Sequence, residues 1–441
     1  MAAIKSCGTP GGLEAAQAGV AVGRIAFSVK SGCDSRVSLF SPMAKTSHLA
    51  SVTVRCGGTV PAEGAPVCAT FGAPLPEELA LVELVGAERI PVAVQVDPVE
   101  PRCATWLVAA RAGAPAVREY ELMRMPGTPW PRVGGPALED AAGVLSFRDG
   151  ERELLGYRYA VQPAPAGVDA VFARGGFIHP LLSPAGAVLT RIQPPDHYHH
   201  YGVWSAWTRV EVGGREVDFW NLGKGEASVR FRGFAQRADG PVFAQATSEL
   251  EHVVLEGGGV VRPVLFERQT LRTYRMLAAD AYLLDLTLVF RCAARQSVAL
   301  LDYRYGGLAW RATADWDRSN STVLTSEGCT RREADGSRAR WCLVQGAVNG
   351  GRARAGAAVL VSPANVHAPE PLRVWPEEEN GRGDVFVNLS PTKGCDWVLE
   401  PDRDHELRYR WLVFDGSRSA DDIEAAWSAY ARGPSVDLGA D

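Results

Sequence analysis

The sequence predicts an all-β fold, a large antiparallel β-sandwich that carries one helix at its C-terminal end. Short apolar runs alternate with polar residues at a period of two, as in residues 90–96, which is typical of half-buried strands. Gly-, Pro- and Asp-containing turns separate these runs. The chain shows no strand–helix–strand alternation, no Gly-x-Gly-x-x-Gly and no phosphate loop, which disfavours a Rossmann or barrel architecture.

The first part of the chain, residues 1–125, is expected to form a β-rich N-terminal region. Alternating runs at 22–29 and 90–96 predict strands, whereas 79–85 is expected to form a helical turn. Residues 126–136 contain four prolines and three glycines, which neither a helix nor a central strand accommodates. We therefore expect a boundary there, followed by a large sandwich domain over residues 137–441.

Within that second region the strands recur at short intervals. Asp149-Gly150 and Gly213-Gly214 are expected to be hairpin turns. The expected strands are 144–148, 153–161, 229–234, 246–255, 264–274, 282–291 and 297–305. The helix should begin after Ser419, because Asp422 three residues later completes a capping box. Its apolar stripe consists of Ile423, Ala426, Trp427 and Tyr430.

Composition excludes several classes of function. The chain has 441 residues, 46% hydrophobic and 22% charged, as in an ordinary globular protein. A net charge of -5 and the lack of a basic block argue against nucleic acid. No apolar run reaches the roughly 18 residues of a spanning helix, and no signal peptide is evident, so we expect a cytoplasmic protein without a membrane partner. Nine cysteines, with no Cys-x-x-Cys, disfavour a disulfide framework and structural zinc.

The segment Asp196-His197-Tyr198-His199-His200 holds three of the eight histidines and is the candidate functional site. If it is extended, His197 and His199 share one face. With a third ligand they would suit zinc, manganese or iron. Alternatively, Asp196 orients His200 and the site performs acid–base chemistry without metal. The catalytic candidates are His199, His200 and Asp196, the metal candidates are His197 and His199, and the cofactor is left open.

Several further side chains are candidates for binding a substrate. Trp204 and Trp220 could offer aromatic faces to the apolar face of a sugar ring. Asn221 follows Trp220, and Arg311 comes shortly after two glycines and could bind ring hydroxyls. The full set of substrate-binding candidates is His179, Trp204, Trp220, Asn221 and Arg311. The competing interpretation is that the histidines bond to loops and the tryptophans fill a core.

A few other polar residues are weaker candidates. His367 lies in a loop and could complete the site. Glu267 and Asp302 could be acids or bases, although a solvated strand face is the default for each. His48, His252 and His405 are expected to be structural.

Several short motifs of this chain resemble the PmoA-like family of bacterial proteins. They are Asp196-His197-x-His199-His200-x-Gly202-Val203-Trp204, Asp218-Phe219-Trp220-Asn221-x-Gly223, Gly306-Gly307-Leu308 with Arg311, Arg340-Trp341, Pro363-x-Asn365 and His179-Pro180-Leu181. The resemblance runs from Gly143 to the C-terminal helix. Departures occur at Tyr198 and Tyr201, where the family tends to have proline and a basic residue, and at Ser362, which replaces a usual histidine. The family label, methane oxygenase, does not fit a chain without spanning helices.

The resemblance implies a galactose-mutarotase-like supersandwich and a role in carbohydrate metabolism. The leading hypothesis is therefore a lyase, hydrolase or epimerase that acts on a sugar, glycoside or keto-sugar by histidine-based acid–base chemistry. Two alternatives stay open: a non-catalytic sugar-binding or assembly module, and a non-haem metal oxygenase. The expected partner is a small-molecule carbohydrate, and the oligomeric state is not predicted.

Overall fold

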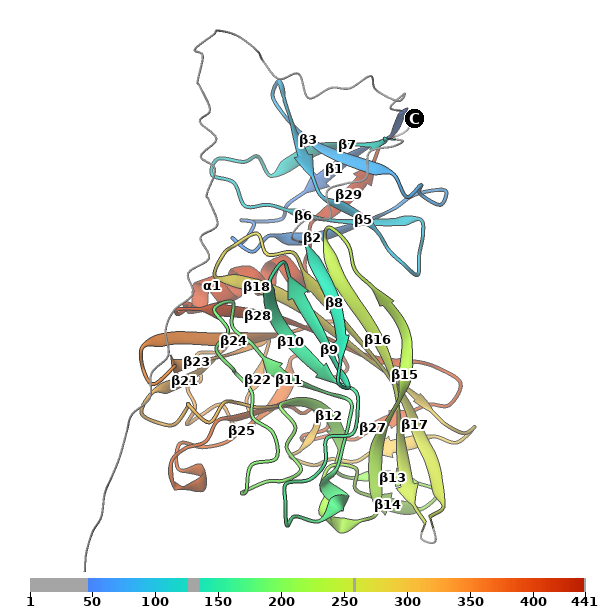
Figure 1. Cartoon of the computed structure of the whole chain (residues 1–441), viewed down its shortest axis with the longest axis vertical. Coiled ribbons are helices and arrows are strands. Elements are labelled where there is room, and N and C mark those ends of the chain that lie inside the picture. The colour runs from blue at the N-terminus through green and yellow to red at the C-terminus, as the bar shows by residue number, and fades with distance from the viewer. Residues whose placement is uncertain (1–46, 126–134, 257–258, 440–441) are drawn as a thin grey trace, which may run out of the picture. The chain divides into compact units, whose positions relative to one another are not determined.

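Two large antiparallel sheets dominate the computed structural model, which describes residues 47–125, 135–256 and 259–439 (Figure 1). The nine-stranded sheet has the order β22 (Arg338–Ala339), β25 (Glu370–Val374), β26 (Phe386–Leu389), β20 (Gly306–Arg311), β12 (Val203–Trp207), β11 (Phe177–Leu181), β10 (Arg152–Arg158), β9 (Val144–Asp149) and β8 (Pro136–Ala141). The eight-stranded sheet has the order β15 (Ala227–Ala238), β16 (Phe243–Leu255), β17 (Val261–Tyr274), β18 (Ala281–Cys292), β28 (His405–Asp415), β24 (Ala353–Val361), β23 (Trp341–Val348) and β21 (Ser321–Thr325).

The period-two pattern of the strands explains why the two sheets pack together. On β12, Val203 and Trp207 belong to the main core, whereas Trp204 and Ala206 face the opposite side of the sheet. The main core draws on strands of both large sheets. A four-stranded sheet adds to it, with the order β14 (Arg215–Val217), β13 (Val210–Val212), β19 (Val298–Leu300) and β27 (Trp397–Leu399). The expected antiparallel β-sandwich is confirmed.

The N-terminal part of the described chain forms two smaller sheets around a core of its own. The five-stranded sheet has the order β29 (Ser435–Leu438), β1 (Ser47–Arg55), β7 (Val117–Arg124), β3 (Leu79–Val85) and β4 (Glu88–Val92). The three-stranded sheet has the order β2 (Ala65–Thr70), β6 (Cys103–Val108) and β5 (Val94–Val96). The last strand, β29, thus pairs with the first, with Val52 opposite Leu438.

Several expectations for this region can now be compared with the structure. The helical turn expected at 79–85 is wrong, because this segment is β3 and pairs with β4 on one side and β7 on the other. The strand expected at 22–29 and most of the linker, residues 126–134, lie outside the described residues. All described residues belong to one compact unit. The division into domains and the supersandwich family stay predictions.

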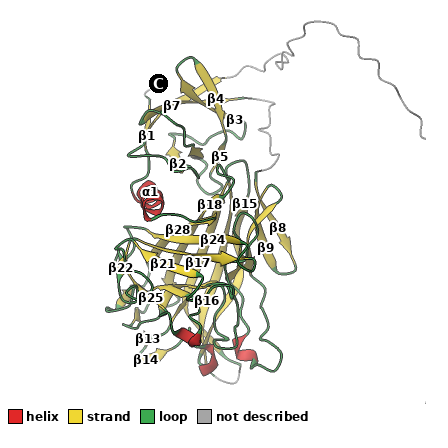
Figure 2. Cartoon of the chain, turned by 90° about the vertical axis from the view of Figure 1, so that its left-hand side faces the viewer, coloured by secondary structure: helices red, strands yellow, loops and turns green. Residues whose placement is uncertain are grey.

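One α-helix of the described chain, α1 (Ala420–Ala431), lies against the strands of the eight-stranded sheet (Figure 2). Its capping box is present as expected, with Ser419 and Asp422 bonded reciprocally. Ile423 and Ala426 are buried in the cluster on the outer face of that sheet. Three short 3-10 turns are η1 (Ala170–Phe172), η2 (Leu222–Lys224) and η3 (Glu379–Gly381).

The helices and cysteines of the described chain can be set beside what the composition predicts. Across residues 47–125, 135–256 and 259–439, no helix combines the length and the apolar character that crossing a bilayer requires. The seven described cysteines are free thiols, of which Cys292 and Cys342 are buried.

Candidate active site

The histidine segment forms two consecutive tight turns and not an extended strand. The amide of His197 donates to the carbonyl of Pro194 at 2.9 Å, and the amide of His200 donates to the carbonyl of His197 at 3.1 Å. The amide of Gln193 closes the loop on the carbonyl of His200 at 2.7 Å. Prolines 194 and 195 favour such turns over a ladder strand. The expectation that His197 and His199 alone share a face is therefore wrong.

These turns bring all three imidazoles together. The ring centroids of His197 and His200 are 4.7 Å apart and stacked, and those of His199 and His200 are 4.9 Å apart and perpendicular. His197 and His199 are 5.4 Å apart. The turns thus place His200 with the other two rings, whereas an extended strand would point it to the opposite face.

The three rings differ in their access to solvent. His200 is 1% exposed and lies between the rings of His197 and Phe386, with no partner for its buried Nδ1 among the described residues. His197 and His199 are half-buried. Neither ring nitrogen of His199 bonds to a described residue. His199 is therefore a partly accessible imidazole with both ring nitrogens unused, whereas Asp196 already engages Nδ1 of His197.

Asp196 holds the segment onto the sheet through a network of ionic hydrogen bonds. Its Oδ1 accepts from Arg191 Nη2 at 2.7 Å. Its Oδ2 accepts from Arg311 Nη2 at 2.7 Å and from Asn380 Nδ2 at 3.0 Å, and lies 2.9 Å from His197 Nδ1. The expected pairing of Asp196 with His200 is wrong, because the first turn places the ring of His197 beside the carboxylate.

Arg311 is the buried centre of this network. Its side chain is fully buried on β20, and Nη2 also donates to Asp384 Oδ2 at 2.8 Å. The guanidinium lies over the ring of Trp375, 4.4 Å from its centroid. A buried arginine requires such charged partners, because an unpaired buried charge costs several kcal/mol. The proposed role of Arg311 in binding ring hydroxyls stays a prediction, and in this structure its guanidinium holds Asp196 and Asp384.

The environment fixes the charges of the site. Burial opposes ionisation of Asp196, but the hydrogen bond from His197 and the charges of Arg311 and Arg191 outweigh it and hold its pKa well below the usual range. Burial and the nearby His197 lower the pKa of His199 to about 4. Burial also lowers the pKa of His200 well below its ordinary value. At neutral pH the site therefore combines an ionised Asp196 with neutral His199 and His200.

A comparison with known families identifies the group to which the chain belongs. The model of DUF6807, a family of unknown function, matches residues 145–428, more than half of the chain. The protein belongs to the DUF6807 family. The assignment to a PmoA-like family is wrong, since the match extends over most of the sandwich whereas the resemblance relied on short motifs. No curated protein matches the chain.

The two tryptophans proposed as sugar-binding faces are buried in this DUF6807 member. Trp204 is 2% exposed and Trp220 is 3% exposed, and their rings pack together with Phe386 on the outer face of the nine-stranded sheet. Trp204 contacts the ring of His200, with a centroid distance of 5.0 Å. Partly exposed aromatic rings of this region include those of Phe172, Tyr198 and Tyr305.

Asn221 is fixed at the edge of this aromatic cluster. Its side-chain amide donates to Asp218 Oδ2 at 2.8 Å, and its backbone amide donates to Asp218 Oδ1 at 2.8 Å. Lys224 completes the group with an ion pair of 2.8 Å to Asp218. The charge of Asp218 also acts on His199, in the direction that raises its pKa.

His179 lies on β11, next to the chain that leads out of the histidine segment. Its Nδ1 is 2.9 Å from Thr190 Oγ1, and burial lowers its pKa to about 4. Gly202, at φ +69°, makes the close approach feasible, because a Cβ there would lie 2.3 Å from the carbonyl oxygen of Ile178 and 3.2 Å from His179 Cβ. His179 is thus beside the segment, but its ring contacts Thr190 and not the three clustered imidazoles.

The weaker candidates lie elsewhere. The Nδ1 of His367 is 2.8 Å from the carbonyl of Pro391 and 3.3 Å from Cys395 Sγ, so His367 does not complete the site. Glu267 is buried against His252 rather than on a solvated face. Asp302 accepts from the amide of Gly394. His405 and His48, which were expected to be structural, contact the carbonyl of Glu400 and the hydroxyl of Ser51.

Sequence reasoning missed five residues of the site. They are Arg191, Trp375, Asn380, Asp384 and Phe386. Arg191 lies five residues before Asp196, so its position in the same loop was the one local signal. The other four reach the histidines only through the folding of β25 and β26 against β20.

The donor set does not favour a metal ion. In the part of the chain that the structure describes, no group of three or more His, Cys, Asp or Glu side chains is arranged to hold one. Asp196, the nearest carboxylate, has both oxygens engaged by arginine, histidine and asparagine donors. A metal at His197 and His199 would have to displace these bonds, and no mechanistic step is derived through one.

Proposed function

We propose that this DUF6807 member is an enzyme that binds a neutral, hydroxyl-rich small molecule of the carbohydrate class beside the histidine cluster, with His199 as its proton-transfer group. One observation carries the proposal: His199 is a half-buried neutral imidazole whose nitrogens are unused, next to a fixed network of charges. A neutral imidazole offers one donor and one acceptor. A substrate can therefore engage both.

The surroundings of His199 suit a group that gains and loses a proton. Its pKa of about 4 keeps the ring neutral, so the acceptor nitrogen is free to take a proton at physiological pH. The negative charges of Asp218 and Asp196 would stabilise the imidazolium that forms, since both act to raise the pKa of His199. Proton abstraction, water activation and protonation of a leaving oxygen all use such a group, so lyase, hydrolase and epimerase chemistry stay within the proposal.

The balance of charge favours a neutral ligand. Arg191 and Arg311 are paired with Asp196 and Asp384, and Lys224 is paired with Asp218. Asp384 also pairs with Arg382, whose side chain is exposed to solvent. The buried part of the site thus has no surplus charge to attract a charged substrate.

The polar and aromatic groups near the cluster favour hydroxyl groups on a ring. Tyr305 presents a partly exposed ring next to Phe386, Tyr198 presents one within the histidine segment, and Asn221, which follows Trp220, carries a half-buried amide. A sugar ring has an apolar C–H face and hydroxyl groups, so aromatic rings next to hydrogen-bonding side chains suit it. This supports the carbohydrate class, independently of any family resemblance.

The test is a panel of glycosides, aldoses and keto-sugars incubated with the protein in deuterated buffer. Deuterium uptake next to a carbonyl, a new double bond or a released reducing end, all visible by NMR, would identify the reaction. We expect His199→Gln to reduce turnover at least a hundredfold, because general acid–base catalysis contributes about 10²- to 10⁴-fold. His48→Gln, a change at an exposed histidine, is the matched control and should retain full turnover.

Two results would contradict the proposal. Full turnover by a folded His199→Gln variant would remove His199 from the chemistry. Binding of a sugar without any turnover, weakened by His199→Gln, would instead identify a non-catalytic sugar-binding module.

A further inference from the structure

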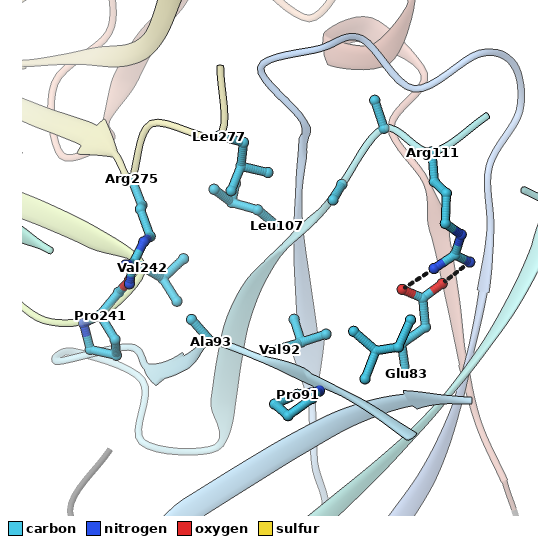
Figure 3. A pocket seen from close by; sticks show the side chains of 13 residues that line it. Glu83, Pro91, Val92, Ala93, Leu107, Arg111, Pro241, Val242, Arg275 and Leu277 are labelled. Atoms are coloured by element: carbon cyan, nitrogen blue, oxygen red, sulfur yellow. Dashed lines mark hydrogen bonds and ion pairs between the residues drawn. The ribbon is translucent and has the colours of Figure 1, made fainter. Parts of the chain in front are cut away.

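A cavity lies away from the histidine cluster, where β3, β4 and β6 of the N-terminal sheets meet the residues just before β16 and just after β17 (Figure 3). Its volume is about 550 Å³, within the range of about 300–1,000 Å³ that is usual for small-molecule sites. Most of its wall is apolar and includes Val92, Ala93, Leu107, Val242 and Leu277. No residue proposed above for catalysis lines it.

Hydrogen bonds hold the two walls of the cavity together. Gln95 Oε1 accepts from the amides of Val242 and Phe243, each at 3.0 Å, and its Nε2 donates to the carbonyl of Phe243 at 3.2 Å. An ion pair of 2.7 Å joins Arg272 to Asp97 next to these bonds. Because Gln95 is buried, these bonds are shielded from water, and the cavity is a fixed feature of the fold.

The charged side chains that line the cavity differ in how well they are paired. Glu83 is paired with Arg111 at 2.8 and 3.3 Å and lies 3.6 Å from Arg118, so its charge is already compensated. Arg275 makes a single bond, of 3.4 Å, to the carbonyl of Pro241. That distance exceeds the usual range for an N–H···O bond.

Arg275 therefore has spare capacity to bind an anion. Its charge acts on Asp149, but that carboxylate accepts from the amide of Met276 at 2.8 Å, and among the described residues Arg275 forms no ion pair with it. Figure 3 shows Arg275 at one end of the cavity and the Glu83–Arg111 pair at the other, with apolar side chains between them. Leu277, beside Arg275, is 41% exposed, which leaves an apolar surface to be covered.

We infer that this cavity binds an amphipathic carboxylate, with the carboxylate on Arg275 and an apolar chain along Leu107, Val242 and Ala93. Burial of the chain supplies the hydrophobic contribution, at about 0.8 kcal/mol per CH₂ in general. The guanidinium supplies direction, since it matches a carboxylate in a two-bond geometry. The inference is independent of the chemistry proposed for His199.

Isothermal titration calorimetry with decanoate at pH 7.5 tests this inference, with decanol as the uncharged ligand of equal chain length. We expect decanoate to bind at least tenfold more tightly than decanol. Arg275→Gln should remove this preference and weaken decanoate about tenfold or more, as expected for a charge-assisted hydrogen bond. Arg215→Gln, an exposed arginine on β14 that does not line the cavity, is the matched control.

A second variant tests the apolar part of the site. Ala93→Trp should fill the cavity and abolish binding of both ligands, with circular dichroism used to check that the fold is retained. The inference is overturned if wild-type protein fails to bind decanoate, if decanol binds equally well, or if Arg275→Gln leaves the affinity unchanged. Retained binding by a folded Ala93→Trp protein would place the ligand elsewhere and overturn it too.

Discussion

The protein contains two histidine–carboxylate pairs in opposite environments. In the core, His252 Nε2 lies 2.7 Å from Glu267 Oε2, and both side chains are fully buried. In the candidate site, His197 Nδ1 lies 2.9 Å from Asp196 Oδ2, and the side chains are 29% and 22% exposed. The bond is nearly the same in both pairs. What separates a structural pair from a candidate functional one is access to a ligand.

The partners of the two carboxylates reinforce this difference. Glu267 receives its second hydrogen bond from Gln269 Nε2, at 2.8 Å, within the sandwich core. Burial raises the pKa of Glu267, but the hydrogen bond and charge of His252 outweigh it, so that its pKa is lowered. Asp196 is instead tied to arginines that anchor a surface loop. The first pair stabilises the core, and the second positions the loop that carries His199.

The largest expected effect is the loss of the core pair. Glu267→Ala would leave His252 buried without its partner, and breaking a buried pair costs about 3–5 kcal/mol. Urea unfolding should show this loss. Glu249→Ala, an exposed carboxylate on the same strand β16 as His252, should change the free energy of unfolding by about 0.5 kcal/mol or less. A loss below about 1 kcal/mol for Glu267→Ala would show that the core pair contributes little.

The corresponding change in the site should be smaller. Asp196→Asn removes the charge shared by Arg191 and Arg311, but Arg311 keeps Asp384 as a partner. We expect a loss of about 1–3 kcal/mol in unfolding free energy, the usual cost of leaving a buried donor poorly satisfied. Asn380→Ala, which removes the bonds of an uncharged amide donor to Asp196 and Asp384, serves as the control and should cost less. If Asp196→Asn destabilises the protein more than Glu267→Ala does, ligand access is not what distinguishes the His197–Asp196 pair from the His252–Glu267 pair.

The smallest expected effect is on the pH dependence of stability. His199 has a pKa of about 4 in the folded protein, below its ordinary value near 6.5, so the unfolded chain binds the proton first as the pH falls. The contribution of neutral His199 to the free energy of unfolding is complete above about pH 6.5 and decreases as the pH falls toward 4. A shift of this size corresponds to roughly 3 kcal/mol for a fully shielded ring, and partial exposure of His199 reduces the effect. His199→Asn should therefore flatten this part of the curve by about 1–2 kcal/mol. Unfolding measured between pH 7.5 and 4 would show this, and an unchanged slope would contradict the assigned environment.

Most of the scaffold could be predicted from the sequence, because strand periodicity, turn residues and helix caps depend on residues that are close together in the sequence. Period-two runs and Asp149-Gly150 indicated the strands, and Ser419 with Asp422 indicated the helix start. The segment 79–85 was misread because a short apolar run has no distinguishing period, and its pairing with β4 and β7 decides its structure.

The site could be predicted only in part. Clustering in the sequence indicated that the histidines act together, and the structure places their rings within 5.4 Å. Their arrangement could not be predicted, because two tight turns, set by backbone bonds at Pro194 and His197, replace the assumed strand. Asp384 was missed because it meets Arg311 only after β26 pairs with β20. The aromatic support for His200 from Phe386 has the same origin.

The pairing of β29 with β1 has a consequence for biosynthesis. The sheet that opens the described chain lacks one edge strand until residues 435–438 have left the ribosome. Until then β1 presents an unpaired edge, which is a template for association with other chains. A change near residues 435–438 would therefore destabilise the N-terminal sheet, although the two are far apart in the sequence. Arg55 and Asp437, for example, are 382 positions apart and joined by a hydrogen bond of 3.0 Å.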